Sequence, residues 1–297
     1  MLHPANFLHV YARYQTHFTP VGMNPQGIIH HPTVLKFGPL PEVTGFGLAV
    51  LLAFVISQII CQRELWRRGY DHEADNIPDL IIAALVGTLI GAKIYYALLT
   101  NDWRSVFSRG GFVFWGGFMG AVVLCWATIK WKKLNFLRIA DVAGLAIAAG
   151  YSIGRTGCWA VGDDYGRPLQ GWLGVKFPEG APASTVMNMT QQFGVQFPDG
   201  TDPSTVVAVH PTQLYETAMG FVMFMILWRN RKHQNAEGWL FGLWCVVAGV
   251  ERFIVEFFRA KDDQFVAGLT IAQVIALAIA LTGAVVMAGK RRRLDLA

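Results

Sequence analysis

The chain contains 297 residues, of which 53% are hydrophobic and only 15% are charged, and its mean hydropathy is +0.37. Soluble domains carry roughly 25% charged residues, so this chain lacks the charge that a water-exposed surface needs. The composition excludes an ordinary soluble domain, a disordered chain, a collagen and a coiled coil, and it favours a polytopic membrane protein. The four cysteines lie in or beside apolar runs without metal-ligand spacing, which indicates packing residues.

Seven apolar stretches follow one another along the chain, each close to the length of about 20 residues that a bilayer-spanning helix needs. We therefore predict an all-α polytopic membrane protein with about seven transmembrane helices. Helices 1–4 fall within residues 43–161, helices 5–7 fall within 213–289, and a basic tail, 290–297, follows them. The predicted spans are 43–61, 79–99, 112–129, 142–161, 213–228, 238–258 and 266–289.

The distribution of Lys and Arg predicts the orientation of these spans. The segments on one side of the membrane hold 14 of the 25 Lys and Arg residues, whereas the segments on the other side hold eight over a greater length. By the positive-inside rule, the N-terminus lies outside and the C-terminus inside. Residues 1–42 and 162–212 are then periplasmic, and the tail is cytoplasmic. The net charge of +5 is a topology signal, and nucleic-acid binding is the poorer explanation.

The segment 162–212 is long and polar, and it contains an internal duplication. The sequence Gly-Val-Lys-Phe-Pro-Glu-Gly at 174–180 returns as Gly-Val-Gln-Phe-Pro-Asp-Gly at 194–200, and a Ser-Thr-Val follows each copy. Two copies are too few for a solenoid. We predict a periplasmic loop insert with turns at Pro-Glu-Gly and Pro-Asp-Gly, in which the duplicated block has no convergent set of charged or nucleophilic groups.

Three basic residues lie inside predicted spans, where a cation is expensive unless it faces a polar cavity or a partner. Lys93, Arg155 and Arg252 each stand 14 residues after the inner start of a span, at Asp79, Asp141 and Gly238. At about 1.5 Å per residue, each rises roughly 21 Å, to the outer third of the membrane. One interpretation is that they snorkel to the interface and pair locally. The other, which matched depth favours, is a cationic cavity suited to a phosphate-bearing lipid headgroup.

Acidic and polar side chains share this level. Arg252, Glu256 and Arg259 are spaced i, i+4, i+7 and therefore share one face of a helix. Glycines on span four allow either close helix packing or the approach of a ligand to the backbone. The further candidates at this level are Asp163, His210, Glu216, Gln273, Gly154 and Gly157.

The stretch Gly-Arg-Thr-Gly-Cys-Trp-Ala-Val-Gly-Asp-Asp-Tyr-Gly at 154–166 resembles the signature of the bacterial prolipoprotein diacylglyceryl transferase family. Two other long motifs match in the same order, His-Pro-Thr-Gln-Leu-Tyr-Glu at 210–216 and Arg-Phe-Ile-Val-Glu-Phe-Phe-Arg at 252–259. Shorter matches include Phe-Gly-Pro-Leu at 37–40. The resemblance covers about residues 35–290.

The resemblance implies a seven-helix enzyme of the bacterial inner membrane that needs no cofactor or metal. Such enzymes move the diacylglyceryl group of phosphatidylglycerol to the lipobox cysteine of a preprolipoprotein, so the implied partners are these two substrates and membrane lipids, without nucleic acid. With the charge argument, it gives Arg155, Arg252, Glu256 and His210 as catalytic residues. The predicted substrate-binding residues are Arg155, Arg252, Arg259, Lys93, Gly154, Gly157, Asp163, Gly166, Glu216 and Gln273.

Four positions depart from the family pattern. Trp115 replaces a histidine, Cys158 an asparagine, and Phe46 and Ala248 each replace a tyrosine. Cys158 is then either a packing residue or a thiol in the pocket that itself receives a lipid. Two other functions remain open on the sequence alone: a non-catalytic homologue that binds phospholipid or lipoprotein, and a transporter of lipid or small anions. The sequence does not favour a transporter, because it lacks the inverted-repeat halves and the interrupted helices that are typical of one.

Overall fold

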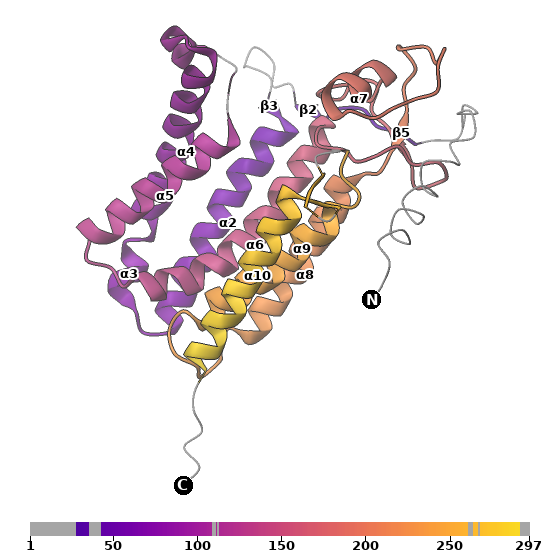
Figure 1. Cartoon of the computed structure of the whole chain (residues 1–297). Helices are drawn as coiled ribbons and strands as arrows, with labels where there is room; N and C mark the ends of the chain where they lie inside the picture. The colour runs from indigo at the N-terminus through magenta and orange to yellow at the C-terminus, as the bar shows by residue number, and fades with distance from the viewer. Residues whose placement is uncertain are drawn as a thin grey trace, which may run out of the picture.

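The computed structural model describes residues 28–35, 43–108, 111, 113–260, 264–266 and 268–291. Most of the predicted N-terminal segment, the Phe-Gly-Pro-Leu motif at 37–40 and most of the basic tail lie outside these residues. The described part is a bundle of long helices, with β2 (Val34–Leu35), β3 (Val43–Thr44), β5 (Ala208–Val209) and α7 (Val186–Phe193) at one end and the short helix α3 (Asp71–Asp75) at the other (Figure 1). The long helices are α2 (Gly45–Arg67), α4 (Ile77–Thr100), α5 (Phe114–Trp131), α6 (Phe136–Val161), α8 (Thr212–Asn230), α9 (Trp239–Val255) and α10 (Ile271–Lys290).

Each of the seven predicted spans coincides with one of these helices, so the described residues are mostly helical, as predicted, although short strands accompany the helices. Five of the helices, α2, α4, α5, α6 and α10, are long and apolar enough to cross a membrane. Helix α9 has 17 residues and α8 begins with a polar turn. The number of spans, seven, therefore stays a prediction, as does their orientation.

Local sequence signals determine where the helices begin and end. The Asn135 side chain accepts hydrogen bonds from the amides of Leu137 and Arg138 and so caps the start of α6. Gly162, at φ +72°, ends the same helix in the left-handed conformation that glycine adopts without strain. Thr270 and Gln273 form a capping box at the start of α10.

Helix α6 is the centre of the bundle and packs on α2, α8 and α9, while α10 packs on α9. Helices α4 and α5 pack mainly on each other and stand to one side (Figure 1). Their contact brings backbone against backbone: a Cβ on Gly91 would collide with the carbonyl of Gly116, and one on Gly87 with that of Gly120. Close approach of small residues is how helices associate in lipid, where burial of apolar surface supplies no driving force.

Short elements connect the helices. They include α3 (Asp71–Asp75), the 3₁₀ helix η1 (Trp103–Phe107) and α7 (Val186–Phe193). One sheet has the order β1 (Ile28–Ile29), β4 (Val175–Lys176), β5 (Ala208–Val209), parallel between the first two strands and antiparallel between the last two. Two antiparallel pairs are β2 (Val34–Leu35) with β3 (Val43–Thr44), and β6 (Gln264–Val266) with β7 (Leu269–Thr270).

The segment 162–212 folds around its own small core, which includes Tyr165, Phe177, Met189 and Val209. The two duplicated copies pair with each other, because Thr185 bridges to Val206. They are not equivalent, however. Phe177 of the first copy is fully buried, whereas the corresponding phenylalanine of the second copy, at 197, is only partly buried at the edge of the same core.

The duplicated serines provide a matched pair of substitutions. Ser184 is buried, and its hydroxyl accepts from the Phe177 amide at 3.0 Å and donates to the Val207 carbonyl at 2.9 Å. Ser204 is exposed and, of the residues that the structure describes, its hydrogen bonds are to Asp202. We expect Ser184→Ala to lower the free energy of unfolding by about 1–3 kcal/mol, because it leaves a buried amide and a buried carbonyl unpaired. Ser204→Ala should change it by less than about 0.5 kcal/mol. Thermal unfolding in detergent measures both, and equal effects would contradict the inequivalence of the copies.

Candidate functional site

Three chain segments meet at one end of the bundle: the loop after α6, the start of α8 and the segment after α9. The Gly166 amide donates to the His210 carbonyl at 2.8 Å, and the Arg167 amide donates to the Phe258 carbonyl at 2.8 Å. The His210 amide returns a bond to Arg167 at 2.9 Å. A Cβ on Gly166 would collide with the Phe258 carbonyl, so this position accepts only glycine. Gly166 therefore allows the loop to fit between the other two segments.

Two arginines and two carboxylates form an ionic cluster at this junction. Arg155 Nη1 donates to Asp164 Oδ2 at 2.9 Å, and Arg155 Nη2 pairs closely with Glu216. Arg259 reaches the same two carboxylates, at 3.3 Å to Asp164 Oδ1 and 3.5 Å to Glu216 Oε1. The Glu216 side chain is 2% exposed and the Asp164 side chain 46% exposed. Glu216 thus contacts both arginines on the buried side of the cluster, and Asp164 contacts both on the solvent-exposed side.

Arg252 belongs to a second, adjoining chain of contacts. Its Nη2 pairs with Glu256 Oε2 at 2.6 Å, as the i, i+4 spacing predicts. Glu256 Oε1 accepts from the Thr270 hydroxyl at 3.2 Å, and Gln273 Oε1 accepts from the Thr270 amide at 3.0 Å. Gln273 therefore serves the start of α10, and through Thr270 it supports the glutamate that orients Arg252.

A buried carboxylate that the sequence analysis missed lies near the three arginines. Glu251 is 8% exposed and accepts a hydrogen bond from the Tyr151 hydroxyl at 2.9 Å. It interacts electrostatically with Arg252, Arg155 and Arg259. Tyr151 stands four residues before Arg155, one turn along α6, so the two side chains share a helix face; no signal in the sequence connects them to Glu251.

The pKa values of the two adjacent aspartates after α6 are shifted in opposite directions. Burial raises the pKa of Asp163, and the neighbouring charge of Asp164 adds to the rise. Burial acts in the same sense on Asp164, but Arg259 and Arg155 outweigh it and hold the pKa of that carboxyl below its usual range. The anionic form of Asp164 is therefore the one that the arginines stabilise.

His210 lies at the start of α8, beside Tyr215 and Phe258. Its Nδ1 is 3.2 Å from the Tyr215 hydroxyl, and both aromatic rings contact the imidazole edge to face. Burial lowers the pKa of His210, so the ring is neutral at pH 7. The structure thus places a neutral histidine in the same loop junction as Gly166.

The remaining predicted site residues take different positions. Lys93 lies on α4 and donates to the Ser108 carbonyl at 2.6 Å, in the helix pair that stands to one side. A Cβ on Gly157 would lie 2.8 Å from the Ala49 Cβ, so this glycine packs α6 against α2. Gly154 faces open space, since a Cβ added there would meet no neighbouring atom within 4 Å among the described residues. Of these two glycines, only Gly154 leaves room for a ligand beside Arg155.

The structure also shows the surroundings of the four residues that depart from the family pattern. Cys158 is buried and accepts from Arg155 Nη1 at 3.4 Å, so its thiol contacts the ionic cluster. Trp115 is 55% exposed on α5. Phe46 lies against Gly157, and Ala248 packs into the same apolar cluster as Tyr151.

One group of side chains has atoms of the kind that bind metals. Cys158, Asp163 and Asp164 place one ligand-type atom each within 4.8 Å of the others. Asp164 is already paired with two arginines, whose charges repel a cation. The donor set at this junction therefore suits an anion better than a metal ion.

Comparison with known proteins gives one consistent family. A family model described as prolipoprotein diacylglyceryl transferase matches residues 32–289. The chain is 30% identical to the phosphatidylglycerol–prolipoprotein diacylglyceryl transferase of Xanthomonas oryzae pv. oryzae, over 88% of this chain and 91% of the relative. It is 26% identical to the enzyme of that name from Clostridium tetani, over 82% and 91% of the two chains. For the Geobacter sulfurreducens enzyme the identity is 29%, over 78% and 84%. The chain belongs to the prolipoprotein diacylglyceryl transferase family.

Proposed function

We propose that this protein transfers the diacylglyceryl group of phosphatidylglycerol to the lipobox cysteine thiol of a preprolipoprotein. The observation that carries the proposal is the Arg155–Arg259 pair, which converges on one half-exposed carboxylate, that of Asp164. A planar guanidinium donates two parallel hydrogen bonds to a carboxylate or a phosphate with similar geometry. In the described state Asp164 occupies the position between the arginines that a phosphodiester would take.

Substrate binding then exchanges one anion for another. Asp164 adopts a left-handed backbone conformation, at φ +55°, directly after α6, and its side chain lies on the open side of the cluster. The Nε atoms of Arg155 and Arg259 are buried and have no hydrogen-bond partner in the described part of the chain. The phosphate of the lipid displaces Asp164 and finds guanidinium groups that Glu216 already orients.

The reaction breaks the bond between a glycerol carbon of the diacylglyceryl group and the phosphate oxygen, and it forms a thioether bond from the cysteine sulfur to that carbon. The thiol proton goes to a base, and glycerol phosphate leaves with the bonding electron pair. Arg155, Arg252 and Arg259 offset the negative charge that grows on this leaving group. Glu256 orients Arg252. Because a free thiol has a pKa near 8.5, the acceptor needs a base. We assign that role to His210, which burial keeps neutral.

The same proposal includes the topology: seven spans in the bacterial inner membrane, with the N-terminus and the segment 162–212 in the periplasm. The excess of Lys and Arg in the segments on one side supports it. The ionic cluster then faces the outer leaflet. A reporter fused after Arg293 should be active in the cytoplasm, and a periplasmic signal there would overturn the orientation.

A transfer assay with purified protein tests the function. Phosphatidylglycerol and a lipobox peptide should give a peptide whose mass has increased by one diacylglyceryl group, with equimolar release of glycerol phosphate. The control peptide, in which serine replaces the lipobox cysteine, should stay unmodified. Binding of both substrates without product would instead identify a non-catalytic homologue.

A further inference from the structure

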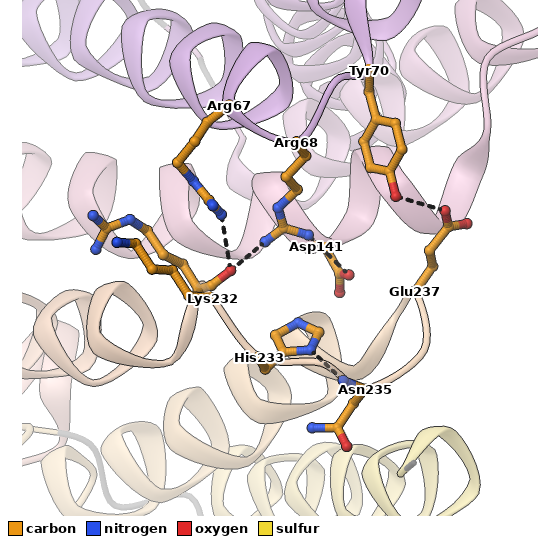
Figure 2. Close-up of a pocket in the computed structure, with 9 residues that line it drawn as sticks. Arg67, Arg68, Tyr70, Asp141, Lys232, His233, Asn235 and Glu237 are labelled. Atoms are coloured by element: carbon orange, nitrogen blue, oxygen red, sulfur yellow. Dashed lines mark hydrogen bonds and ion pairs between the residues drawn. The ribbon is translucent and has the colours of Figure 1, made fainter.

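A second polar site lies at the other end of the bundle. Asp141 stands 14 residues before Arg155 on α6, which separates the two by roughly 21 Å along the helix. Beside Asp141 is an open cavity of about 260 Å³, bordered by the ends of α2 and α8 and by the turn that leads into α9 (Figure 2). Its lining residues are Arg67, Arg68, Tyr70, Asp141, Arg231, Lys232, His233, Asn235 and Glu237.

The carboxylates at this cavity already have partners within the protein. Asp141 is fully buried and accepts from the amides of Gly238, at 3.0 Å, and Phe241, at 2.9 Å. Glu237 accepts from Arg138 Nε at 2.7 Å and from the Tyr70 hydroxyl at 3.2 Å. A third carboxylate, Glu64, does not line the cavity but is paired with Arg67 and Arg68, which do. The protein thus uses its own acceptors in internal contacts.

Several donors at the same cavity have no such partner in the described part of the chain. His233 Nδ1 lies 3.1 Å from the Asn235 amide and must accept its proton, so we assign the ring proton to Nε2. Among the residues that the structure describes, Nε2 is buried without a hydrogen bond, as is Arg231 Nε, whose nearest carboxylate oxygen, in Glu64, is 3.6 Å away. Within the described residues, the exposed Lys232 makes no hydrogen bond or ion pair.

These donors line the same cavity. Arg67 Nη2 and Arg68 Nη2 both donate to the Arg231 carbonyl, at 3.2 Å each, and this contact draws two guanidinium groups toward Lys232 (Figure 2). In the same view the His233 ring turns one nitrogen to Asn235 and the other toward Arg68. Buried donors without an acceptor are costly, and a ligand rich in acceptors removes that cost.

We infer that this cavity binds a phosphate group, either on an anionic lipid of the adjacent leaflet or as the free ion. The cavity lies between the ends of membrane helices, where basic pockets bind lipid headgroups. Phosphate offers several strong acceptor oxygens to arginine, lysine and the histidine Nε2–H, and its charge balances the local excess of cations. The site is separate from the Arg155–Arg259 cluster, so its occupancy does not depend on the transfer reaction.

Calorimetric titration of the full-length protein in neutral detergent tests this inference. The probes are short-chain phosphatidic acid and inorganic phosphate, and each is titrated into the wild type and into Arg155→Ala, which strongly weakens the other phosphate site. Phosphatidic acid should still bind to Arg155→Ala. If inorganic phosphate binds equally well, the free ion is sufficient; if it does not bind, the lipid is the ligand. Binding of either probe supports the phosphate site.

Two charge reversals three residues apart provide the matched comparison. In the Arg155→Ala protein, Lys232→Glu should weaken binding at least about tenfold, because it places a like charge beside the phosphate. Arg229→Glu reverses an exposed charge at the same helix end, outside the cavity, and should stay within about twofold. Lys232→Arg should retain binding, and its unfolding temperature shows that position 232 tolerates substitution. Equal effects of the two reversals, or no binding of either probe to Arg155→Ala, would overturn the inference.

Discussion

Substitution of Arg155 by alanine should abolish measurable diacylglyceryl transfer and weaken phosphatidylglycerol binding by a large factor. The change removes the charge and the donors from a site that includes the buried Glu216, which is then left with a more distant partner, Arg259, at 3.5 Å. Truncating one member of a buried, hydrogen-bonded charge pair costs about 2–5 kcal/mol, which corresponds to about 30- to 4,000-fold in affinity. Binding in nanodiscs and the transfer assay measure the two effects separately.

The control for this experiment is Arg104→Ala, which removes an exposed arginine from η1. It should leave both readouts within about twofold of the wild type. Arg252→Lys gives a finer comparison, because it retains the charge and loses the planar donor pair. If Arg155→Ala and Arg252→Lys fold normally and bind phosphatidylglycerol as the wild type does, the arginine cluster is not the headgroup site.

Among substitutions outside the ionic cluster, Asp141→Ala should cause the largest decrease in the free energy of unfolding. Its carboxylate is fully buried, accepts the first free amides of α9 and lies 3.6 Å from Arg68 Nη1. Removing it leaves these donors without an acceptor and Arg68 without one of its two carboxylate partners, an uncompensated loss of about 3–5 kcal/mol. The unfolding transition in detergent should move to markedly lower denaturant concentration.

The comparison for Asp141 is Asp79→Ala, near the start of α4. Asp79 pairs with Lys132 at 2.7 Å, but the two side chains are 46% and 33% exposed, and such a pair contributes about 0–1 kcal/mol. Asp141→Asn should fall between the two alanine variants, because the amide keeps one acceptor oxygen. Equal stability of Asp141→Ala and Asp79→Ala would show that the carboxylate does not hold the start of α9.

The long helices were predictable because each is encoded by a continuous run of apolar residues of sufficient length, which is a local signal in the chain. The Arg252–Glu256 pair was predictable for the same reason, since both residues lie one turn apart on one helix. The argument from depth in the membrane grouped Arg155 and Arg252 with Lys93, which instead bonds to Ser108 beside α4. It did not specify the convergence of Arg155 and Arg259 on Asp164 and Glu216.

Contacts between distant parts of the chain were the ones that the sequence could not specify. Tyr151 and Glu251 are 100 residues apart, and a tyrosine on an apolar helix face beside a glutamate next to an arginine looks ordinary in sequence. Gly154 and Gly157 are equivalent in the pattern, yet only the second contacts α2. The choice between Asp163 and Asp164 depended on the direction in which the loop leaves α6. In each case the deciding fact is a neighbour that only the folded chain supplies.

The inequivalence of the duplicated copies has an evolutionary consequence. A tandem duplication begins as two identical segments under identical constraint, but in this fold the two copies have different surroundings. Ser184 and Phe177 are enclosed by the small core of the insert, while Ser204 faces water. Selection for folding therefore acts unequally on the two segments. Among descendants of this gene, drift and changes of length should accumulate at the turn after the second copy, and the first copy should preserve the ancestral residues.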